Sequence, residues 1–541
     1  MSSSFASQSV STTLTLCMLA GALYIVAQSI WRLYFSPIAK FPGPKLAALT
    51  YWYETYYDIF CGGEYLWKIK ELHEQYGPIL RINPHELHVS DPEFYHILYA
   101  GGINKRDRDP WHTASLALEG SMLASPKHEL HRKRRGALAP FFSKESSRRL
   151  LPFLQERIDT MVRRLEEMKD TEKVVNLIQV LSAFSNDVVM EVCFGRHEHR
   201  LDDKDFDPSY HSTVLNGGKS SVLFRHFPIV LKIVFGLPQR VTLLLPDFAD
   251  LIKQRQVGLL YCISSSKKKS SNQIVLTSAQ EIGANIESIR KSGKLSDTDH
   301  DTIFHHLLKS DLPPSEKTTH RLTDEGITVV GAGSHTVAWT LSVACYEILA
   351  SPTIFKNIKA EFSTIKTDEA SLAVFLAQLE KLPYLTAVIK EALRLAYGVS
   401  LRIPRTAPDT VLNYKGWEIP PGTAVAMTTV LLHQDSNIFP QPLEFKPERW
   451  LNDKERSLDR YLTSFSAGSR VCLGMNLAWA ELYLTLWGLF SAFGGEGVRG
   501  EGDKAILELY ETDRSDVQIR KDFFFPTVKE SSKGVRVVVK S

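Results

Sequence analysis

Apolar residues recur at helical spacing along most of this 541-residue chain. In the segments Ser147–Met168 and Val174–Cys193 they return every three to four positions, which is the period of a helix with one buried face. The segment Asp324–Leu349 is more continuously apolar, with Thr323 placed to cap its first turn and Pro352 beyond its end. The pattern therefore predicts a body built mainly from α-helices.

Shorter stretches follow the alternating pattern of strands. Ile79–Val89 alternates and contains a turn, which is typical of a β-hairpin. In Val411–Met427, short alternating runs are separated by Gly416 and by Pro420-Pro421-Gly422, so small strands joined by turns are expected. The expected fold class is mainly α with small β-sheets.

The N-terminus is the longest uncharged apolar stretch. Leu14–Ile30 has no charged residue, and with its flanks the stretch Val10–Phe35 reaches the roughly 20 residues that span a bilayer. Trp31 and Tyr34 fit an aromatic belt at the membrane surface. A cleaved signal peptide and a short core helix are the alternatives, but no basic residues precede the stretch and no small-residue cleavage site follows it. Residues 1–35 are therefore predicted to be a transmembrane anchor.

Basic residues after this anchor set its orientation. Arg32, Lys40 and Lys45 all follow it, so the positive-inside rule leaves the rest of the chain in the cytosol. Pro42-Gly43-Pro44 cannot continue a helix, and residues 36–45 are expected to form a stiff hinge. Residues 46–541 then form the main domain.

Two later segments are predicted to lie near the surface. Phe227–Leu251 is apolar, but three prolines interrupt it, so it is too broken to span a membrane. It is expected either to dip into a membrane surface or to pack on the core. Ser264–Ser271 (SSSKKKSS) is expected to be a surface loop.

Composition narrows the classes of function. The formal net charge is only +3, which gives no general basis for nucleic-acid binding. The six cysteines lie far apart and show no CxxC spacing, which favours a reducing compartment with most of them buried. A single functional thiolate fits this background.

Cys472 is the candidate for that thiolate. It lies in the sequence FSAGSRVCLG, directly before the apolar helical run Leu473–Phe490. The unpaired N–H groups and the dipole at a helix N-terminus stabilise a thiolate. Gly468 allows a left-handed turn, Gly474 leaves room for a flat macrocycle, and Arg470 is placed to meet an anionic group.

This loop resembles the haem-binding loop of the cytochrome P450 family, FxxGxRxCxG. The resemblance implies that Cys472 ligates the iron of haem (heme b), that Arg470 reaches a haem propionate, and that Phe465 and Gly474 belong to the same cofactor site. It also implies a P450-like fold preceded by the transmembrane helix, with residues 46–541 as the haem-thiolate catalytic domain.

Two further motifs stand in the order that this family shows. Glu391 and Arg394 lie three residues apart on one helix face, and Pro447–Trp450 reads PERW. In the family, the helix pair joins the arginine of that second motif, here Arg449, in a buried cluster. Such a cluster tolerates desolvation only when every member stays paired, so loss of Glu391 or Arg394 is expected to abolish haem incorporation.

The long helix carries two glycines, Gly331 and Gly333, each costing about 1 kcal/mol relative to alanine. A flat cofactor or O2 against the backbone would explain them, and so would close helix packing. The sequence AGSHT resembles the oxygen-binding helix of the family, which implies catalytic roles for Ala332, Gly333, His335 and Thr336. Thr336 is also expected to bond the carbonyl four residues back. His335 replaces the usual acid, and it is expected either to relay protons or to be a packing or substrate contact.

The basic stretch His128–Phe142 has three interpretations: a solvated basic face, a nuclear-localisation-like run, or the propionate-binding helix of the family. In the last, His131 and Arg135 share a helix face and bind haem propionates. Arg132–Arg134 would point elsewhere and dock an acidic electron donor. Arg405 matches a further propionate-binding position of the family.

Substrate contacts are expected, by analogy with the family, from loops that vary between its members. The candidates are Ile103–Ala124, the glycine stretch of the long helix, Val399–Arg402 and Phe524–Thr527. These segments are mostly apolar, which suits a lipophilic small molecule.

The resemblance implies a monooxygenase that inserts one atom of O2 into such a molecule. The sequence is similar to membrane-anchored P450s of filamentous-fungal secondary metabolism, such as those oxidising terpenoids. Electrons would come from NADPH through NADPH-cytochrome P450 reductase, with cytochrome b5 as an additional donor, at the endoplasmic reticulum membrane. The alternatives are a haem-thiolate isomerase or dehydratase that needs no O2, and a non-catalytic haem-binding membrane protein. Gly333, Thr336 and Cys472 argue against the last.

Overall fold

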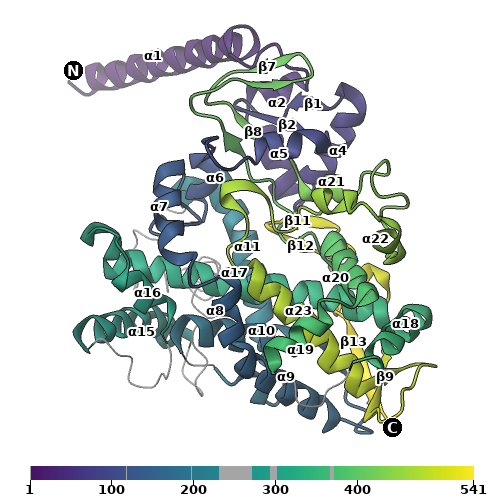
Figure 1. Ribbon diagram of the computed structural model, residues 1–541. Coiled ribbons are helices and arrows are strands. Elements are labelled where there is room, and N and C mark those ends of the chain that lie inside the picture. The colour runs from purple at the N-terminus through teal and green to yellow at the C-terminus, as the bar shows by residue number, and fades with distance from the viewer. Residues whose placement is uncertain (1, 117, 196–197, 231–270, 293–300, 366–370) are drawn as a thin grey trace.

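Long helices form the body of the molecule, and small sheets lie around it (Figure 1). The computed structural model describes residues 2–116, 118–195, 198–230, 271–292, 301–365 and 371–541. This arrangement confirms the predicted fold class, mainly α with small β-sheets.

The helices have the following bounds: α1 Ser2–Ile30, α2 Lys45–Leu49, α3 Trp52–Thr55, α4 Tyr65–Tyr76, α5 Tyr95–Leu98, α6 Pro110–Ala114, α7 His128–Leu138, α8 Lys144–Arg149, α9 Leu151–Glu166, α10 Leu177–Phe194, α11 Pro208–His226, α15 Ser271–Ser292, α16 Ile303–Lys309, α17 Thr319–Leu349, α18 Pro352–Phe362, α19 Leu372–Leu379, α20 Pro383–Ala396, α21 Thr429–His433, α22 Glu448–Asn452 and α23 Met475–Ala492. The strands are β1 Ile79–Arg81, β2 Glu86–Val89, β3 Asp107–Arg108, β4 Val175–Asn176, β5 Arg405–Thr406, β6 Leu412–Tyr414, β7 Trp417–Ile419, β8 Ala424–Ala426, β9 Phe493–Gly495, β10 Ala505–Leu509, β11 Lys521–Phe523, β12 Phe525–Thr527 and β13 Arg536–Lys540.

Helix α17 runs through the centre of the body and packs along α10. Its side chains Ala338 and Leu341 are fully buried, as are Leu181 and Phe184 of α10. Helices α9, α18, α20 and α23 contribute to the same apolar cluster. Apolar residues surround α17 on most sides because its neighbours enclose it on most sides.

The predicted start of the long helix is wrong by about one turn. Helix α17 begins at Thr319 because Thr318 accepts the Arg321 N–H at 3.4 Å and caps the first turn. Thr323, predicted as the cap, instead donates to Thr319 O at 2.9 Å inside the helix.

Two other predicted helices also differ at their ends. The segment predicted as one helix from 147 to 168 is divided between α8 and α9, with the break at Leu150, just before Pro152 in the first turn of α9. The helix predicted from Val174 begins three residues later. Its first residues instead form β4, which pairs with β13, and Asn176 caps α10 through the Ile178 N–H at 3.2 Å.

The predicted small strands are present. The hairpin of β1 and β2 pairs Ile79 with Val89, and the second predicted region contains the hairpin of β6 and β7, followed by β8. A five-stranded sheet in the order β1-β2-β8-β5-β3 places Arg108 opposite Arg405 in antiparallel register. A four-stranded sheet in the order β4-β13-β10-β9 ties the C-terminus to α10.

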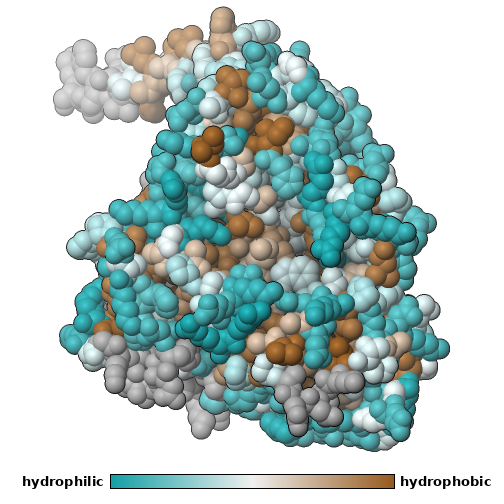
Figure 2. All heavy atoms as spheres, viewed as in Figure 1, coloured by the Kyte–Doolittle hydropathy of each residue, from teal (hydrophilic) through white to brown (hydrophobic). Residues whose placement is uncertain are grey.

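The N-terminal helix projects from the body with apolar side chains on its surface (Figures 1 and 2). None of the apolar window within Thr12–Phe35 is buried, and the segment is long and apolar enough to cross a membrane. Leu177–Phe194 and Thr319–Ala350 also meet these criteria, but they are mostly buried within the protein. The Arg32 guanidinium donates to Leu49 O at 2.5 Å, which fastens the base of the apolar helix to α2. The exposed helix fits the predicted anchor.

The predictions for Phe227–Leu251 and Ser264–Ser271 fall almost entirely outside the described residues.

Candidate functional site

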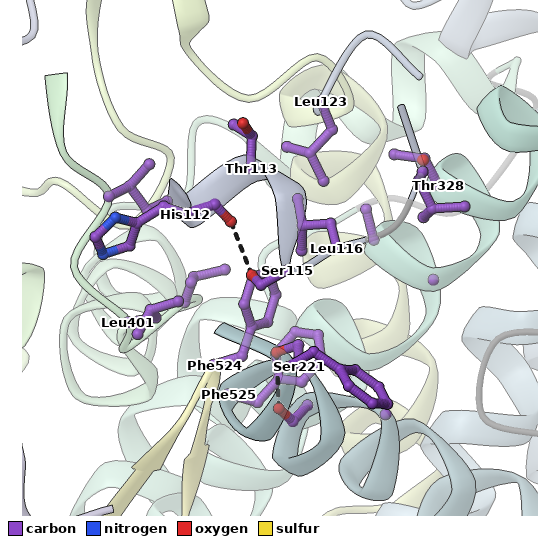
Figure 3. Close-up of a pocket in the computed structure, with 18 of the residues that line it drawn as sticks. His112, Thr113, Ser115, Leu116, Leu123, Ser221, Thr328, Leu401, Phe524 and Phe525 are labelled. Atoms are coloured by element: carbon purple, nitrogen blue, oxygen red, sulfur yellow. Dashed lines mark hydrogen bonds between the residues drawn. The ribbon is translucent and has the colours of Figure 1, made fainter. Parts of the chain in front are cut away.

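Two adjoining cavities lie beside the middle of α17. The Cys472 cavity, of about 290 Å³, is bounded by the loop before α23 and by α17. The apolar cavity, of about 240 Å³, lies between α17, α11 and the segment that contains α6 (Figure 3). Ala332 and Thr336 of α17 line both cavities. A molecule in either cavity therefore borders the same turn of this helix.

The loop of Cys472 has a conformation that its glycine makes accessible. Gly468 has a φ of +69°, and a Cβ at this position would lie only 2.2 Å from Tyr99 O and 2.3 Å from Ala100 O. The Cys472 N–H donates to Phe465 O at 2.8 Å and closes the loop. These contacts turn the sulfur toward the cavity just before α23.

The Cys472 side chain is exposed and lines the cavity. Burial raises the pKa of this thiol, while the Gly474 N–H and the charge of Arg135 lower it. Burial prevails, so the pKa of the free thiol lies above its usual value, although the Gly474 N–H at the start of α23 acts in the direction predicted for a helix N-terminus. A bound metal cation deprotonates a coordinating thiol, so this sulfur suits a metal ligand.

The wall around Cys472 is shaped for a flat group. Gly474 faces the cavity, and a Cβ added there would meet no atom within 4 Å. Phe465, Leu477 and Ala478 continue this side as an apolar surface, with Ala332 opposite on α17. A planar ring system with a central metal fits between these two surfaces.

Three arginine side chains and a neutral imidazole form a cationic edge on the Cys472 cavity. His131, Arg135, Arg470 and Arg108 line it, and Arg405 lies behind them. Burial and the neighbouring guanidinium groups lower the pKa of His131 to about 2 and that of Arg470 to about 9. Arg135 is further fixed by donating to Val471 O at 2.7 Å.

Several nitrogens of this cluster remain available to a ligand. Among the described residues, His131 Nδ1, Arg108 Nε and Arg470 Nε have no hydrogen-bond partner although they are buried. Buried donors without partners are costly, and carboxylate oxygens satisfy guanidinium groups well. The edge therefore fits an anionic group with several oxygens, such as a pair of carboxylates. The sulfur, the flat slot and this edge together match the donor set of a haem.

Arg108 was missed by the sequence predictions. It lies in the two-residue strand β3 and reaches the cluster because β3 pairs with β5, which carries Arg405. Both neighbouring arginines, Arg405 and Arg470, contribute with burial to a strongly lowered pKa of Arg108. A strand of two residues has too little pattern to be recognised in a sequence.

The predicted catalytic residues of α17 divide between different surroundings. Thr336 Oγ1 donates to Ala332 O at 2.9 Å, as expected from its position in the helix. Gly331 opens on the apolar cavity. Gly333 also borders the Cys472 cavity, but a Cβ there would lie 2.8 Å from Val189 Cγ2, so close packing against α10 requires this glycine.

His335 lines neither cavity. Its buried ring lies 4.6 Å from the Phe525 ring and 5.5 Å from the His211 ring, measured between centroids. Burial and nearby His211 hold its pKa well below the usual value, so the ring is neutral near pH 7. This placement corresponds to the packing interpretation of His335.

Glu391 is fully buried, and four residues donate hydrogen bonds to its carboxylate. Arg394 donates from Nε at 2.9 Å and from Nη2 at 2.7 Å, and Arg449 Nε donates at 3.0 Å. The Lys446 N–H and Trp450 Nε1 each donate at 2.9 Å. The predicted association of the helix pair with the PERW arginine is therefore present.

The cluster reaches the cysteine loop through a histidine. Arg394 Nη1 donates to His433 O at 2.8 Å. The Thr463 N–H donates to His433 Nε2 at 2.9 Å, so His433 Nδ1 carries the proton that bonds Arg394 O. Ser464 Oγ donates to Leu393 O at 2.8 Å. These bonds fix the start of the loop that ends at Cys472.

The basic run of α7 does not face solvent throughout. Arg132 and Lys133 are exposed, as expected for a docking surface. Arg134 is buried and pairs with Glu316 at 2.7 Å, so its predicted outward orientation is wrong. Side chains three residues apart on a helix differ in direction by about 60°, so a basic run does not point one way. Helix α16 and the 3-10 helix Pro314–Lys317 pack beside α7 and cover Arg134.

The apolar cavity is lined by all four segments predicted to contact substrate. They contribute Leu116, Gly331, Leu401 and Phe524, among other residues. Helix α11 adds a wall that the sequence predictions missed, because it carries no motif; its contributions are Val214, Gly217, Gly218, Ser220, Ser221 and Phe224.

Several hydroxyl groups that line the apolar cavity already donate hydrogen bonds to backbone carbonyls. Figure 3 shows Ser115 Oγ bonded to His112 O and Ser221 Oγ bonded to Gly218 O, both at 2.8 Å. Thr328 Oγ1 likewise donates to Asp324 O at 2.8 Å. These hydroxyls offer a ligand only acceptor lone pairs, so the cavity favours an apolar and uncharged occupant.

Comparisons with known proteins agree with this geometry. The family model for cytochrome P450 matches residues 57–510. The cytochrome P450 monooxygenase tpcC of Cochliobolus heterostrophus is 40% identical, with 100% of this chain and 99% of that protein covered. Tryptophan 6-hydroxylase fscE of Fusarium equiseti is 39% identical, with 94% of each chain covered. The chain belongs to the cytochrome P450 family.

Proposed function

We propose that this protein is a membrane-anchored haem-thiolate monooxygenase that inserts one atom of O2 into a neutral, lipophilic small molecule. Membership of the P450 family implies a haem-thiolate cofactor and a monooxygenase. The observation that carries the proposal is the junction of the two cavities. Cys472 opens into one, the other is apolar, and Ala332 and Thr336 border both.

Each predicted site residue has an assigned part. The sulfur of Cys472 would hold the iron of heme b, between Phe465 and Gly474 on one side and Ala332 on the other. His131, Arg135, Arg405 and Arg470, joined by Arg108, would hold the two propionates. When bound, the haem supplies O2 activation.

Proton handling is assigned to Thr336 rather than to its neighbour. Thr336 lines both cavities; its Oγ1 donates a hydrogen bond to Ala332 O and can still accept one through its lone pairs. His335 is enclosed, neutral and away from both cavities, so it is assigned to packing against Phe525. Gly333 permits α10 to approach this turn of the helix.

The remaining parts of the proposal concern partners and place. Residues 1–35 would anchor the protein in the endoplasmic reticulum membrane, residues 36–45 would form the hinge, and residues 46–541 would form a cytosolic catalytic domain. NADPH would supply electrons through a reductase, and exposed Arg132 and Lys133 support an acidic partner there. The apolar lining supports a substrate of fungal secondary metabolism such as a terpenoid.

A reduced, CO-bound difference spectrum tests the iron ligand. Wild type should show the thiolate-type spectrum, Cys472→Ala should lose it, and the matched control Cys61→Ala should retain it. A thiolate-type spectrum in Cys472→Ala would refute the assignment of the sulfur.

Turnover tests the reaction class. Metabolite profiling of a deletion strain should identify the accumulating substrate, and its conversion by wild type should require NADPH, reductase and O2. Isotopically labelled O2 should place one labelled oxygen atom in the product. Conversion without O2 would instead indicate an isomerase or dehydratase, and a normal spectrum without any conversion would indicate a non-catalytic haem protein.

A further inference from the structure

The segment of residues 119–126 has neither helix nor strand, yet it lies between the two cavities. Leu123 lines both cavities, and Met122 lines the Cys472 cavity. Ser121 and Ser125 are fully buried. A buried irregular segment needs hydrogen-bond partners from elsewhere for its backbone, so the origin of those partners decides how it is held.

Two adjacent carboxylates of α17 provide partners on one side. The Gly120 N–H donates to Asp324 Oδ2 at 2.8 Å. The Met122 N–H donates to both oxygens of Glu325, at 3.2 and 3.1 Å. Glu325 is fully buried, and an ion pair with Arg321 balances its charge. Hydrogen bonds from N–H groups to a charged carboxylate are stronger than those to a neutral acceptor.

The contact with α17 depends on a glycine. A Cβ at Gly120 would lie 2.7 Å from Asp324 Oδ2 and 2.9 Å from the Arg321 Cα. Both are closer than real Cβ contacts, and one of them is a backbone atom that cannot move aside cheaply. The segment therefore lies as near to α17 as a residue without a side chain allows.

Guanidinium groups hold the carbonyls of the same segment. Arg108 Nη1 donates to Leu123 O at 2.6 Å, and Arg470 donates to Ser125 O and Pro126 O, each at 2.9 Å. Both arginines belong to the cationic edge of the Cys472 cavity. Arg134 Nη1 adds bonds to the carbonyls of residues 119 and 121, at 3.0 and 3.1 Å.

We propose that Asp324 and Glu325 are positioning residues that clamp residues 119–126 against α17, and so set the wall between the substrate and cofactor cavities. The clamp fixes Leu123 in that wall and keeps the carbonyl partners of Arg108 and Arg470 in register with the cationic edge. This inference rests on the proposed function only for the naming of the two cavities. Asp324 lines neither cavity, whereas Glu325 borders the Cys472 cavity and its carboxylate is engaged by Arg321 and by the Met122 N–H.

The direct test is hydrogen–deuterium exchange of the haem-loaded, full-length protein in detergent. Asp324→Ala removes the acceptor of the Gly120 N–H, and Gly120→Ala pushes the segment away from α17. Each should raise exchange in residues 119–126 by roughly tenfold, the effect of losing one charge-assisted hydrogen bond. Glu325→Ala should act in the same direction, and Glu325→Gln tests the charge alone if the alanine variant does not fold.

Asp453→Ala is the matched control. Asp453 also accepts backbone N–H groups, at the first two residues of the 3-10 helix Ser457–Tyr461, and these residues line neither cavity. It should raise exchange only there. Exchange of residues 119–126 that stays unchanged in both Asp324→Ala and Gly120→Ala would overturn the proposal.

Binding of two azoles to the haem iron gives an independent reading of the wall. Imidazole needs little space beside the iron, whereas clotrimazole also needs the neighbouring cavity. In Asp324→Ala and Gly120→Ala, the spectral dissociation constant of clotrimazole should change several-fold while that of imidazole stays constant. Equal changes for both azoles, or none for either, would contradict the clamp. Neither measurement needs turnover, so a protein that binds azoles normally but oxidises nothing would refute the proposed function and leave the clamp intact.

Discussion

Replacement of Glu391 by alanine is expected to prevent haem incorporation. The carboxylate is fully buried and accepts from Arg394, Arg449, Trp450 and the Lys446 N–H. Removal of one partner from a buried ion pair costs about 3–5 kcal/mol, because the remaining charge stays buried without compensation. Domains are stable by only about 5–15 kcal/mol in total, so this loss is a large share of the margin.

Removal of Glu391 should disturb the Cys472 loop through a chain of hydrogen bonds. Without Glu391, Arg394 loses two of its bonds, and its hold on His433 O weakens. His433 in turn positions the Thr463 N–H at the start of the cysteine loop. The loop would then present the sulfur in many orientations, and the entropy of ordering it would count against haem binding.

The assay compares haem content and thermal unfolding of wild type, Glu391→Ala, Glu391→Gln and the control Glu448→Ala. Glu448 is exposed, and its carboxylate accepts a hydrogen bond from the Tyr384 hydroxyl at 3.0 Å, outside the Glu391 cluster. Glu448→Ala should load haem normally. Glu391→Gln keeps the shape without the charge and should load haem poorly. If Glu391→Ala holds a full complement of haem and unfolds at the wild-type temperature, the structural reasoning about this cluster is wrong.

Three further substitutions test other parts of the scaffold. Gly468→Ala should abolish the thiolate-type CO spectrum, because its Cβ would overlap Tyr99 O at a positive φ, and a normal spectrum would contradict this. Burial lowers the pKa of His433 to about 3, while the unfolded chain takes up this proton near pH 6.5. The neutral imidazole therefore gives its full contribution to stability above pH 6.5, and the free energy of unfolding should fall by about 1.4 kcal/mol per pH unit below that pH. In His433→Gln, the unfolding temperature should depend less on pH in this acidic range. Arg134→Ala should lower the unfolding temperature, whereas exposed Arg132→Ala should leave it unchanged and slow only reduction by the reductase.

Local motifs explain why much of the site could be predicted from the sequence. Cys472, Gly468 and Arg470 lie within five residues, so their spacing alone defines a loop with a sulfur, a left-handed turn and a cation. The Glu391 and Arg394 pair is likewise set by one helix turn. The apolar periodicity predicted that α10 and α17 exist and where they end. It did not predict their first residues, which are set by the caps Asn176 and Thr318.

Long-range contacts explain what the sequence could not supply. Arg108 joins the cationic edge only through the pairing of two short strands, and Asp324 reaches Gly120 across 204 positions of the chain. The direction of His335 was open because two burial environments border α17. Consecutive residues on a helix differ by about 100°, so Thr336 can border the cavities while His335 faces the Phe525 side.

The cationic edge gives a physical reason for the hydrogen bonds that hold its arginines to the backbone. Burial lowers the pKa values of Arg108, Arg405 and Arg470; Arg405 adds to this at both Arg108 and Arg470, and Arg470 adds to it at Arg108, so the chain alone holds these charges together at a cost. A ligand with two carboxylates converts that repulsion into attraction and meets the donors that have no partner among the described residues. The gain on binding is largest when the cations cannot move apart beforehand, which is the usual benefit of preorganisation. The backbone carbonyls of residues 119–126 provide that restraint on Arg108 and Arg470. Under the proposed clamp, we therefore expect the wall of the apolar cavity and the affinity for haem to depend on the same eight residues.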